Sequence, residues 1–377
     1  MKAIRIAAIA RKEALHIVRD PRSLGMAIAI PLLLLLLFGY ALTLDVDNVP
    51  LIVWDQSHTP ASREFLAHLT GSRYFSARGF VQDYQAIEDA IDSNEALVGI
   101  VIPRDFAERA KKPGPVQVQA IIDGSDSNTA TIAAGYLNAI ALDYSKEILL
   151  EQTRRLSGKT AYDPIDFRPR TWFNADLESK NYIIPGLIAV IMMVIAALLT
   201  SLTVAKEWEQ GTMEQLIATP VKGPELILGK LLPYFAIGMF DVLIAVLMGE
   251  FLFDVPFRGS VVLLFAVSAV FLAGALALGI FISITAKSQL LASQLAMILT
   301  FLPSFLLSGF MYDIGNMPRA VQLITYVIPA RYFVSLLKGI YLKGVGLEIL
   351  GLEAALLTVF GMVMIFMAIA KFKKRLE

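Results

Sequence analysis

Six long apolar segments constrain this chain more than any other feature of its sequence. As a helix rising about 1.5 Å per residue, each is long enough to cross the roughly 30 Å hydrocarbon core of a bilayer. The segments cover residues 24–44, 182–205, 231–253, 260–284, 290–312 and 351–370. Hydrophobic residues make up 56% of the chain and charged residues only 18%, which is unlike a soluble domain. The sequence therefore predicts a polytopic α-helical membrane protein with six transmembrane helices.

Lysine and arginine residues predict how these helices are oriented. They gather ahead of the first apolar segment, between the second and third, after the fourth and after the sixth. Because basic residues beside the membrane favour the cytoplasmic side, we expect these stretches, including the tail 371–377, to be cytoplasmic. Residues 313–350 also contain Arg331 and Lys338, but the apolar pieces there are too short to cross the bilayer. We expect that stretch to form extracytoplasmic re-entrant helices.

Residues 1–23 have the pattern of a cytoplasmic interfacial helix. Apolar residues alternate there with arginines and lysines that can face phospholipid headgroups. Asp20 and Pro21 would end this helix. Two interpretations stay open, a helix that links a moving partner to the first span and a plain basic anchor.

Residues 45–181 form a long, more polar insertion between the first and second transmembrane helices. Short apolar runs alternate with helical stretches, which predicts a small extracytoplasmic α/β domain ending in a long helix over residues 129–156. Asp123 and Asp126 fit turn and N-cap positions. No nucleophile, metal-binding or phosphate-binding motif accompanies them, so we expect docking or gating from this domain and no catalysis.

Several kinds of site are excluded by composition. The chain has no cysteine, which removes disulfides, zinc–thiolate sites and iron–sulfur centres. His16, His58 and His68 are scattered and lack the spacing of a metal site. The formal net charge is zero and no basic face is clustered, so a nucleic-acid partner is not expected. We predict no catalytic residue, no metal and no cofactor bound by this chain.

The stretch from Gly223 to Lys230 superficially resembles a nucleotide-binding P-loop. Its two glycines, Gly223 and Gly229, are one residue too far apart, and Leu231 stands where a magnesium-binding Ser or Thr is needed. The motif fails. Any ATP hydrolysis must therefore reside in a partner protein.

Residues 206–230, KEWEQGTMEQLIATPVKGPELILGK, form a polar and partly amphipathic segment between two apolar runs. Glu207 and Glu214 surround a turn that carries Met213 and Leu216, and proline and glycine residues break the chain afterwards. This pattern predicts a short helix parallel to the membrane, with an apolar face that docks a partner. A merely solvated loop is the alternative.

Asp241 lies within the third apolar segment, roughly 16 Å along the helix from Lys230 and so near the middle of the bilayer. An ionisable residue at that depth indicates a function by default. We hypothesise that Asp241 faces the interior of the protein and influences cationic compounds on a substrate path. A structural hydrogen bond or a protonated acid is the alternative.

The fourth apolar segment carries small residues at helical spacing. Ala269, Ala273 and Ala277 recur every four residues, with Gly274 and Gly279 nearby. Such residues permit close packing of helices. The pattern fits a dimer seam or packing within the subunit.

Four short motifs give the chain a family resemblance. The most specific is the block EWEQGTMEQL at residues 207–216, and the others support it. They are Lys12-Glu13 with Arg19-Asp20-Pro21, Ile102-Pro103-Arg104-Asp105-Phe106, and Ile328-Pro329-Ala330-Arg331-Tyr332-Phe333. In these motifs the chain resembles the membrane subunits of ABC-2 type transporters, in the multidrug-efflux branch, over nearly its whole length.

The resemblance implies a permease subunit in the bacterial inner membrane. With a second copy or a paralogue it would form an outward path for hydrophobic or amphipathic compounds such as drugs. A separate ATP-binding cassette subunit, which binds ATP and magnesium, would drive it. Segment 206–230 would be the coupling helix that meets this ATPase through Glu207, Gly211, Thr212, Met213, Glu214, Leu216 and Pro220. Short helices around Pro329, Arg331 and Tyr332 would gate the exit, and the outer domain could dock a periplasmic adaptor.

Other functions stay open on the sequence alone. ABC-2 folds also export lipids and polysaccharides, so the fold does not choose the substrate. A secondary transporter would be expected to show inverted repeats, and no obvious repeat is present. A receptor would explain the outer domain but neither six spans nor a coupling loop.

Overall fold

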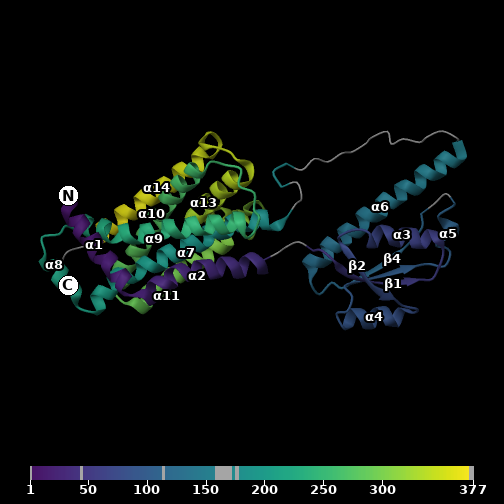
Figure 1. Cartoon of the computed structure of the whole chain (residues 1–377), viewed down its shortest axis with the longest axis horizontal. Helices are drawn as coiled ribbons and strands as arrows, with labels where there is room; N and C mark the ends of the chain where they lie inside the picture. Colours follow the sequence, from purple (N-terminus) through teal and green to yellow (C-terminus); the bar gives the residue numbers. More distant parts are fainter. Residues whose placement is uncertain (1, 43–45, 113–114, 158–171, 175–177, 373–377) are drawn as a thin grey trace. The chain divides into compact units, whose positions relative to one another are not determined.

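The protein folds as two compact units in the computed structural model (Figure 1). Unit 1 comprises residues 1–43 and 170–377, and unit 2 comprises residues 44–169. Each unit has a hydrophobic core of its own. The insertion predicted after the first transmembrane helix is therefore a separate compact unit. The structure describes residues 2–42, 46–112, 115–157, 172–174 and 178–372.

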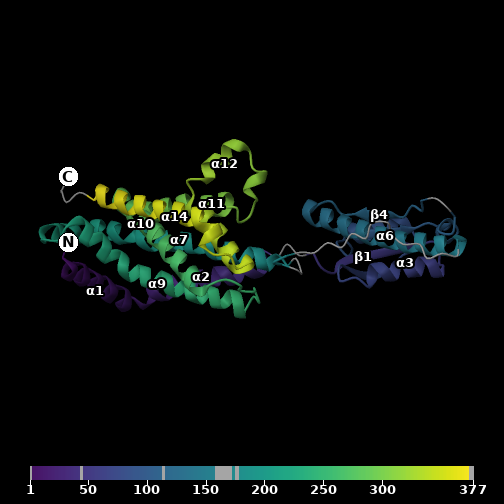
Figure 2. The ribbon, with the colours of Figure 1, turned by 90° about the horizontal axis from the view of Figure 1, so that it is seen from above.

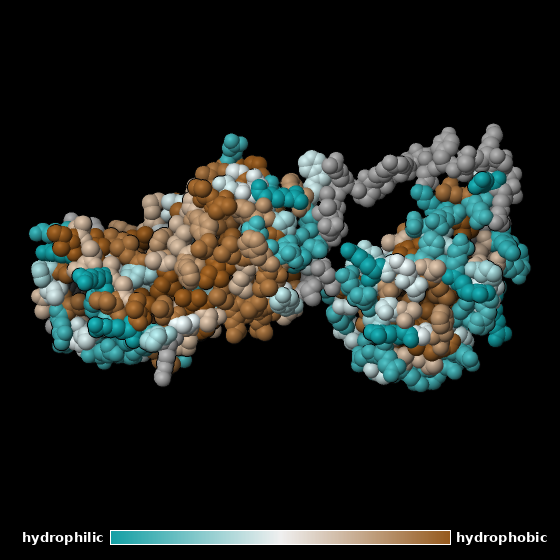
Figure 3. Space-filling view, in the orientation of Figure 1, coloured by the Kyte–Doolittle hydropathy of each residue, from teal (hydrophilic) through white to brown (hydrophobic). Residues whose placement is uncertain are grey.

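Six helices in the described part of unit 1 are long and apolar enough to cross a membrane, as the sequence predicted. They lie side by side in a bundle (Figures 1 and 2). Figure 3 shows an apolar surface over much of this bundle and a more polar surface on unit 2. The protein is thus a polytopic helical membrane protein. The six helices are α2 Pro21–Ala41, α7 Ser179–Glu209, α9 Gly223–Phe251, α10 Val261–Ala286, α11 Gln289–Leu307 and α14 Leu347–Lys371.

The central helix of the bundle is α7. Its most apolar window is 89% buried, whereas the windows of the other five helices are 17–50% buried. Helices α2, α9, α10 and α11 all pack against it. Helix α10 is equally apolar in its most apolar window but only 50% buried, and lipid can cover apolar faces in a bilayer, so the central place of α7 reflects its packing rather than its hydrophobicity alone.

Small residues of α10 allow its neighbours to approach closely within the subunit. A Cβ atom on Gly279 would lie 2.1 Å from Thr200 Oγ1 and 2.3 Å from the Ala197 carbonyl oxygen, both on α7. A Cβ atom on Gly274 would lie 3.0 Å from the Cα atom of Gly361 on α14. For these two glycines the structure supports packing within the subunit rather than a dimer seam.

The bundle has two different ends. The α8 end carries α1 (Ala3–Arg19), α8 (Thr212–Ala218), the turn between α10 and α11, and the last residues of α14. The α13 end carries the start of α7 and a series of short helices between α11 and α14. They are η1 Ile314–Asn316, α12 Arg319–Thr325, α13 Pro329–Lys338 and the π-helix η2 Gly339–Lys343. Helix α12 meets the α13–η2 helix at a bend of 84°.

Unit 2 is a four-stranded sheet with helices on both faces. The strand order is β2-β1-β3-β4, with β2, β1 and β3 parallel and β4 antiparallel to β3. Helices α3 and α6 cover one face through Phe65 and Tyr144, and α4 covers the other through Ile87. The α/β prediction is confirmed. The elements are β1 Val49–Asp55, α3 Pro60–Thr70, β2 Phe75–Phe80, α4 Tyr84–Asp92, β3 Val98–Ile102, α5 Phe106–Arg109, β4 Gln119–Ile122 and α6 Ser127–Ser157.

Asp123 and Asp126 make the local hydrogen bonds expected of turn and cap residues. Asp123 Oδ1 accepts from the backbone N–H of Ser125 at 2.9 Å. Asp126 Oδ1 accepts from the backbone N–H of Asn128 at 3.1 Å, just where α6 begins. Their carboxylates therefore position the start of a helix, which agrees with the turn and N-cap interpretation.

The contact between α7 and α10 predicts the effect of enlarging Gly279. Gly279→Val should lower stability by about 1–3 kcal/mol, because the added carbons overlap α7. The matched control is Gly25→Val in α2, since a Cβ atom there would meet nothing within 4 Å. Thermal unfolding in detergent should show a lower melting temperature for Gly279→Val only. Equal melting temperatures would contradict this packing.

Candidate functional site

Helix α8 lies in the loop between α7 and α9. The chain turns into it at Gly211, whose φ of +69° is in the left-handed region that glycine adopts without strain. Met213 is fully buried and belongs to the core of unit 1, and Leu216 packs against that core. Glu214 is exposed. Met213 therefore anchors α8 to the bundle, and the exposed side chains of α8 include the polar Glu214 and Gln215.

The residues predicted to contact an ATPase do not share one surface. Direct contact with another protein is open to the exposed ones, whereas the buried ones hold the segment in place. Glu207 and Met213 are buried, Thr212 and Leu216 are half-buried, and Gly211, Glu214 and Pro220 are exposed. The apolar docking face that the sequence suggested is turned, at Met213, toward the bundle.

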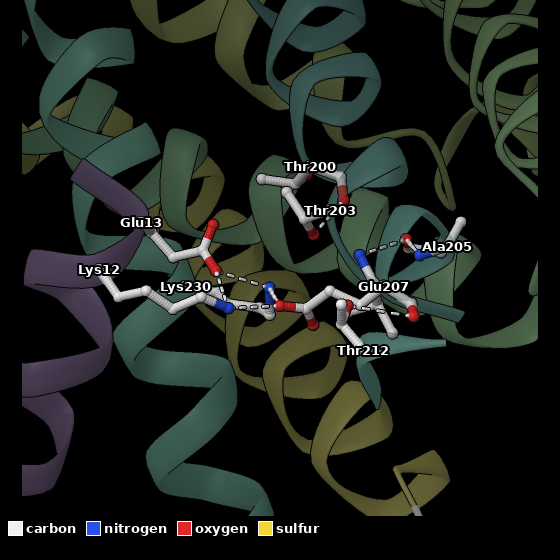
Figure 4. Close-up of polar contacts among 10 residues, drawn as sticks. Lys12, Glu13, Thr200, Thr203, Ala205, Glu207, Thr212 and Lys230 are labelled. Carbon is white, nitrogen blue, oxygen red and sulfur yellow. Dashed lines mark hydrogen bonds and ion pairs between the residues drawn. The ribbon is translucent and has the colours of Figure 1, made fainter. Parts of the chain in front are cut away.

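A cluster of charged side chains, buried except for the partly exposed Lys12, joins α1, α7 and α9 beside this segment (Figure 4). Lys230 Nζ lies 2.8 Å from Glu13 Oε1 and 2.9 Å from Glu207 Oε1. Lys12 Nζ lies 2.9 Å from the same Glu207 oxygen and 3.7 Å from Glu13 Oε1. We call these four residues the ion cluster. Each of the three helices contributes at least one charge, so the cluster ties all three together.

The ion cluster is balanced, with two cations and two carboxylates. Lys230 is only 1% exposed, and Glu13 and Glu207 are 6% and 7% exposed. An unpaired charge at such depth is costly, so each member depends on the others. Burial alone would lower the pKa of Lys12, but its hydrogen bond to Glu207 and the nearby carboxylate of Glu13 together raise the pKa above its ordinary 10.5. Lys12 therefore stays protonated at neutral pH.

A second contact fixes the start of α1 to the loop after α8. Glu225, which is 1% exposed, accepts hydrogen bonds from the backbone N–H of Lys2 at 2.8 Å and of Lys222 at 3.0 Å. Arg5 donates to the carbonyl oxygen of Pro220 at 2.5 Å and lies 3.5 Å from Glu225 Oε2. The N-terminal helix α1 thus packs on the loop after α8 and on α9. A plain basic anchor would contact only lipid headgroups and would not need these contacts.

A third contact joins the end of α7 to the turn between α10 and α11. Glu209 Oε1 accepts from the backbone N–H of Gln289 at 2.7 Å, and Glu209 Oε2 accepts from the Gln289 side chain at 2.5 Å. Lys287 Nζ lies 5.0 Å from the centre of the Trp208 ring. Helix α1, helix α9 and the turn between α10 and α11 therefore all contact the last residues of α7, which lead into α8.

The P-loop-like stretch is not a phosphate-binding loop. From Gly223 onward it is the first part of the helix α9. Lys230, which would have to reach a phosphate, is engaged by Glu13 and Glu207 instead. The sequence argument against nucleotide binding agrees with this geometry.

Asp241 is buried inside the bundle. The residue is 1% exposed, and neither carboxylate oxygen has a hydrogen-bond partner among the described residues. One turn earlier, Gly238 faces Leu272 of α10, so this side of α9 packs against α10. Ser268 of α10 likewise has a buried hydroxyl without a partner in the described ranges. The prediction that Asp241 faces the interior of the subunit fits its burial.

The three residues predicted at the exit lie at the bend between α12 and α13. Pro329 begins α13. Tyr332 donates its hydroxyl hydrogen to the Tyr326 carbonyl oxygen at 2.6 Å, and the Arg331 guanidinium lies 3.9 Å from the centre of the Tyr326 ring. Arg331 also donates to the hydroxyl of Thr325. These contacts hold α12 and α13 in their bent arrangement.

In unit 2, folding brings together three groups that sequence reasoning left apart. His68 of α3 lies beside Asp143 and Glu147 of α6, with one donor atom of each within 4.8 Å of the others. His68 Nε2 is 3.4 Å from Glu147 Oε2. Asp143 and Glu147 are exposed, and exposed acidic groups of this kind are common without a metal. We treat this grouping as a polar surface contact between α3 and α6.

Comparison with known proteins gives a consistent result. Residues 21–370 match a family described as ABC-2 family transporter protein. Over 376 residues the chain is 39% identical to the probable multidrug ABC transporter permease YbhS of Escherichia coli (strain K12), covering 99% of this chain and 98% of that one. It is 30% identical to the probable multidrug ABC transporter permease YbhR of the same organism, covering 92% of each chain. It is also 26% identical to the inner membrane transport permease YhhJ of that organism, covering 76% of each.

The ion cluster predicts that Lys230 is essential for stability. Lys230→Met should lower the free energy of unfolding by about 3–5 kcal/mol, because two buried carboxylates then share only Lys12. Lys222→Met is the matched control, since Lys222 lies in the same polar segment and is exposed. The measurement is thermal unfolding in detergent. If Lys230→Met were as stable as Lys222→Met, the cluster would not be holding the helices together.

Proposed function

The chain belongs to the ABC-2 family of transporter proteins, and on this premise we propose that it helps to export hydrophobic or amphipathic compounds. It is the transmembrane permease component of such a transporter and not the ATPase. The names of two relatives, both probable multidrug permeases, support drugs as substrates. A separate ATP-binding cassette subunit would supply the energy, with ATP and magnesium bound to that partner.

The observation that carries the proposal is the way α8 is held. Met213 anchors α8 in the core, while Glu214 is free to meet another protein. The ion cluster, the Glu225 contacts and the Glu209 contacts surround this segment. A displacement of α8 caused by an ATPase would therefore be transmitted to α1, α7 and α9 together. This is the behaviour that a coupling element requires.

A second permease subunit would complete the outward path. The chain is similar to two different permeases of one organism over more than 90% of its length, which supports a paralogue as well as a second copy as the partner. Helix α11 adds a structural reason. Only 22% of its most apolar window is buried within this chain, and only 17% in α2 and α14, so much of these three helices is left to contact lipid or another subunit.

The distribution of basic residues supports an orientation with the α8 end in the cytoplasm of a bacterial cell and the inner membrane around the bundle. The name of one relative, an inner membrane transport permease, supports this location. Unit 2 and the α13 end would then be extracytoplasmic. In this arrangement the bend at Pro329, Arg331 and Tyr332 would gate the exit, and unit 2 could dock a periplasmic adaptor.

The coupling proposal predicts the loss of a partner from an α8 variant. The tagged protein, purified in mild detergent from its native membrane, should bring an ATP-binding cassette protein with it. Glu214→Lys should reduce the amount of this partner about tenfold, the effect of losing a few charge-assisted contacts. Glu348→Lys, at an exposed site of α14 at the other end of the bundle, should leave it unchanged. Retention of the ATPase by Glu214→Lys, also after cross-linking, would count against α8 as the docking site.

The burial of Asp241 predicts an effect on substrate choice. We expect Asp241→Asn to reduce efflux of cationic amphiphiles about tenfold, since a buried carboxylate without a partner attracts a cation. Efflux of neutral amphiphiles should change little. Ser268→Ala serves as the control, because Ser268 also has a buried polar atom but no charge. An unchanged substrate profile together with an unchanged pH dependence would refute the role.

A further inference from the structure

A cavity of about 450 Å³ lies at the α13 end of unit 1. Its volume is in the range of pockets that hold small ligands. The walls come from the start of α7, the end of α11, the α12–α13 bend and the first turns of α14. Its charged and aromatic lining includes Tyr182, Asp313, Arg331, Tyr332, Lys338 and Glu353.

Two basic side chains line this cavity, and their closest contacts are with neutral groups. Lys338 Nζ donates to the Gly309 carbonyl oxygen at 3.0 Å and lies 3.4 Å from the centre of the Tyr182 ring. The Arg331 guanidinium contacts the Tyr326 ring and the Thr325 hydroxyl. These contacts fix the positions of both side chains. Burial lowers the pKa of Lys338 to about 7, although the nearby carboxylate of Asp313 opposes the shift, so a bound anion would stabilise the protonated amine. Within the described ranges neither side chain forms an ion pair, so both retain the capacity to bind an anion.

The cavity also holds a carboxylate that is incompletely satisfied. Glu353 on α14 is half-buried, and its Oε2 atom is buried without a hydrogen-bond partner among the described residues. A buried acceptor of this kind is costly to leave unpaired. Although Lys338 lines the same cavity, it does not close an ion pair with Glu353 in the described structure. Opposite charges therefore face one space and remain apart.

A ligand that carries both charges would satisfy both sides. We propose that this cavity binds the zwitterionic headgroup of a membrane phospholipid, with its phosphate toward Lys338 and Arg331 and its ammonium toward Glu353. A purely anionic headgroup would be repelled by Glu353, and a purely cationic one by the two basic residues. Asp313, which is exposed at the rim, adds a further acceptor for the ammonium.

The surface beside the cavity suits the acyl chains of the same lipid. Leu352 lines the cavity and is 69% exposed, and Met362 and Phe366 further along α14 are 59% and 71% exposed. From Glu353 to Phe366 the helix extends about 20 Å, which is more than half of the roughly 30 Å hydrocarbon core. A lipid anchored at Glu353 could therefore lay its chains along α14. This inference requires only that the bundle lies in a membrane, and it does not depend on the transported substrate.

The test is lipid binding to the full chain. The purified protein is delipidated in detergent, mixed with equal amounts of phosphatidylethanolamine, phosphatidylcholine and phosphatidylglycerol, and studied by native mass spectrometry. We expect about tenfold more phosphatidylethanolamine than phosphatidylglycerol to remain bound. Phosphatidylcholine should be intermediate, because its quaternary ammonium cannot donate a hydrogen bond to Glu353. Preference for phosphatidylglycerol, or no preference, would overturn the proposal and leave the cavity to anions or to water.

Variants assign the binding to this cavity. Glu353→Gln should abolish the preference for phosphatidylethanolamine, and Lys338→Met should weaken the binding of all three lipids. Glu348→Gln and Lys343→Met are the matched controls, since both residues are exposed nearby and neither lines the cavity. If Lys338→Met lowers the melting temperature, Arg331→Gln takes its place. Unaltered lipid preference in a folded Glu353→Gln protein would overturn the assignment.

Discussion

The buried ammonium group of Lys230 is the constraint on which the α8 end depends. A charge that is 1% exposed has to be compensated by neighbours, and here Glu13 and Glu207 come from two other helices. Their pairing determines where α1 lies on α9 and where α7 ends. Because Glu207 is followed within a turn by Gly211 and α8, the position of α8 follows from the same ion pairs. Hydrophobic packing of Met213 in the core of unit 1 then adds to these ion pairs.

Coupling between the two ends of the bundle also needs a connection from the α8 end to the α13 end. Helix α7 provides it, since it runs through the centre of the bundle from Ser179 to Glu209. Its contact with α10 at Gly279 is too close for any larger residue, so the two helices cannot slide past each other without opening that contact. Displacement of α8 would therefore be transmitted along α7 as far as Pro185, which interrupts the helical hydrogen bonds near the start of the helix. The small residues of α10 serve this connection rather than flexibility.

Much of this arrangement could be predicted from the sequence, for specific physical reasons. Apolar segments longer than the bilayer is thick have few alternatives to spanning helices, and alternating short apolar runs favour an α/β unit. The partners of Lys230 could not be predicted, because Glu13 is 217 positions away and nothing local selects it. The sequence also did not reveal that Met213 is buried within its own chain. A seven-residue amphipathic helix has an apolar face that suits the core of its own chain as well as a partner. The surface contact between His68 and Glu147 could not be predicted either, because it forms only after α3 packs on α6.

The two ends of the bundle hold their charged side chains in different ways, and this difference has mechanical consequences. At the α8 end, cations meet carboxylates at 2.8 and 2.9 Å, and separating them would expose unpaired charge in a buried place. At the α13 end, Lys338 and Arg331 rest on a carbonyl oxygen, a hydroxyl group and aromatic rings, contacts that water can replace at lower cost. We therefore expect a conformational change imposed on the bundle to break contacts first at the α13 end. A lipid headgroup that bridges Lys338 and Glu353 would raise that cost, so the composition of the surrounding membrane would influence how readily this end opens.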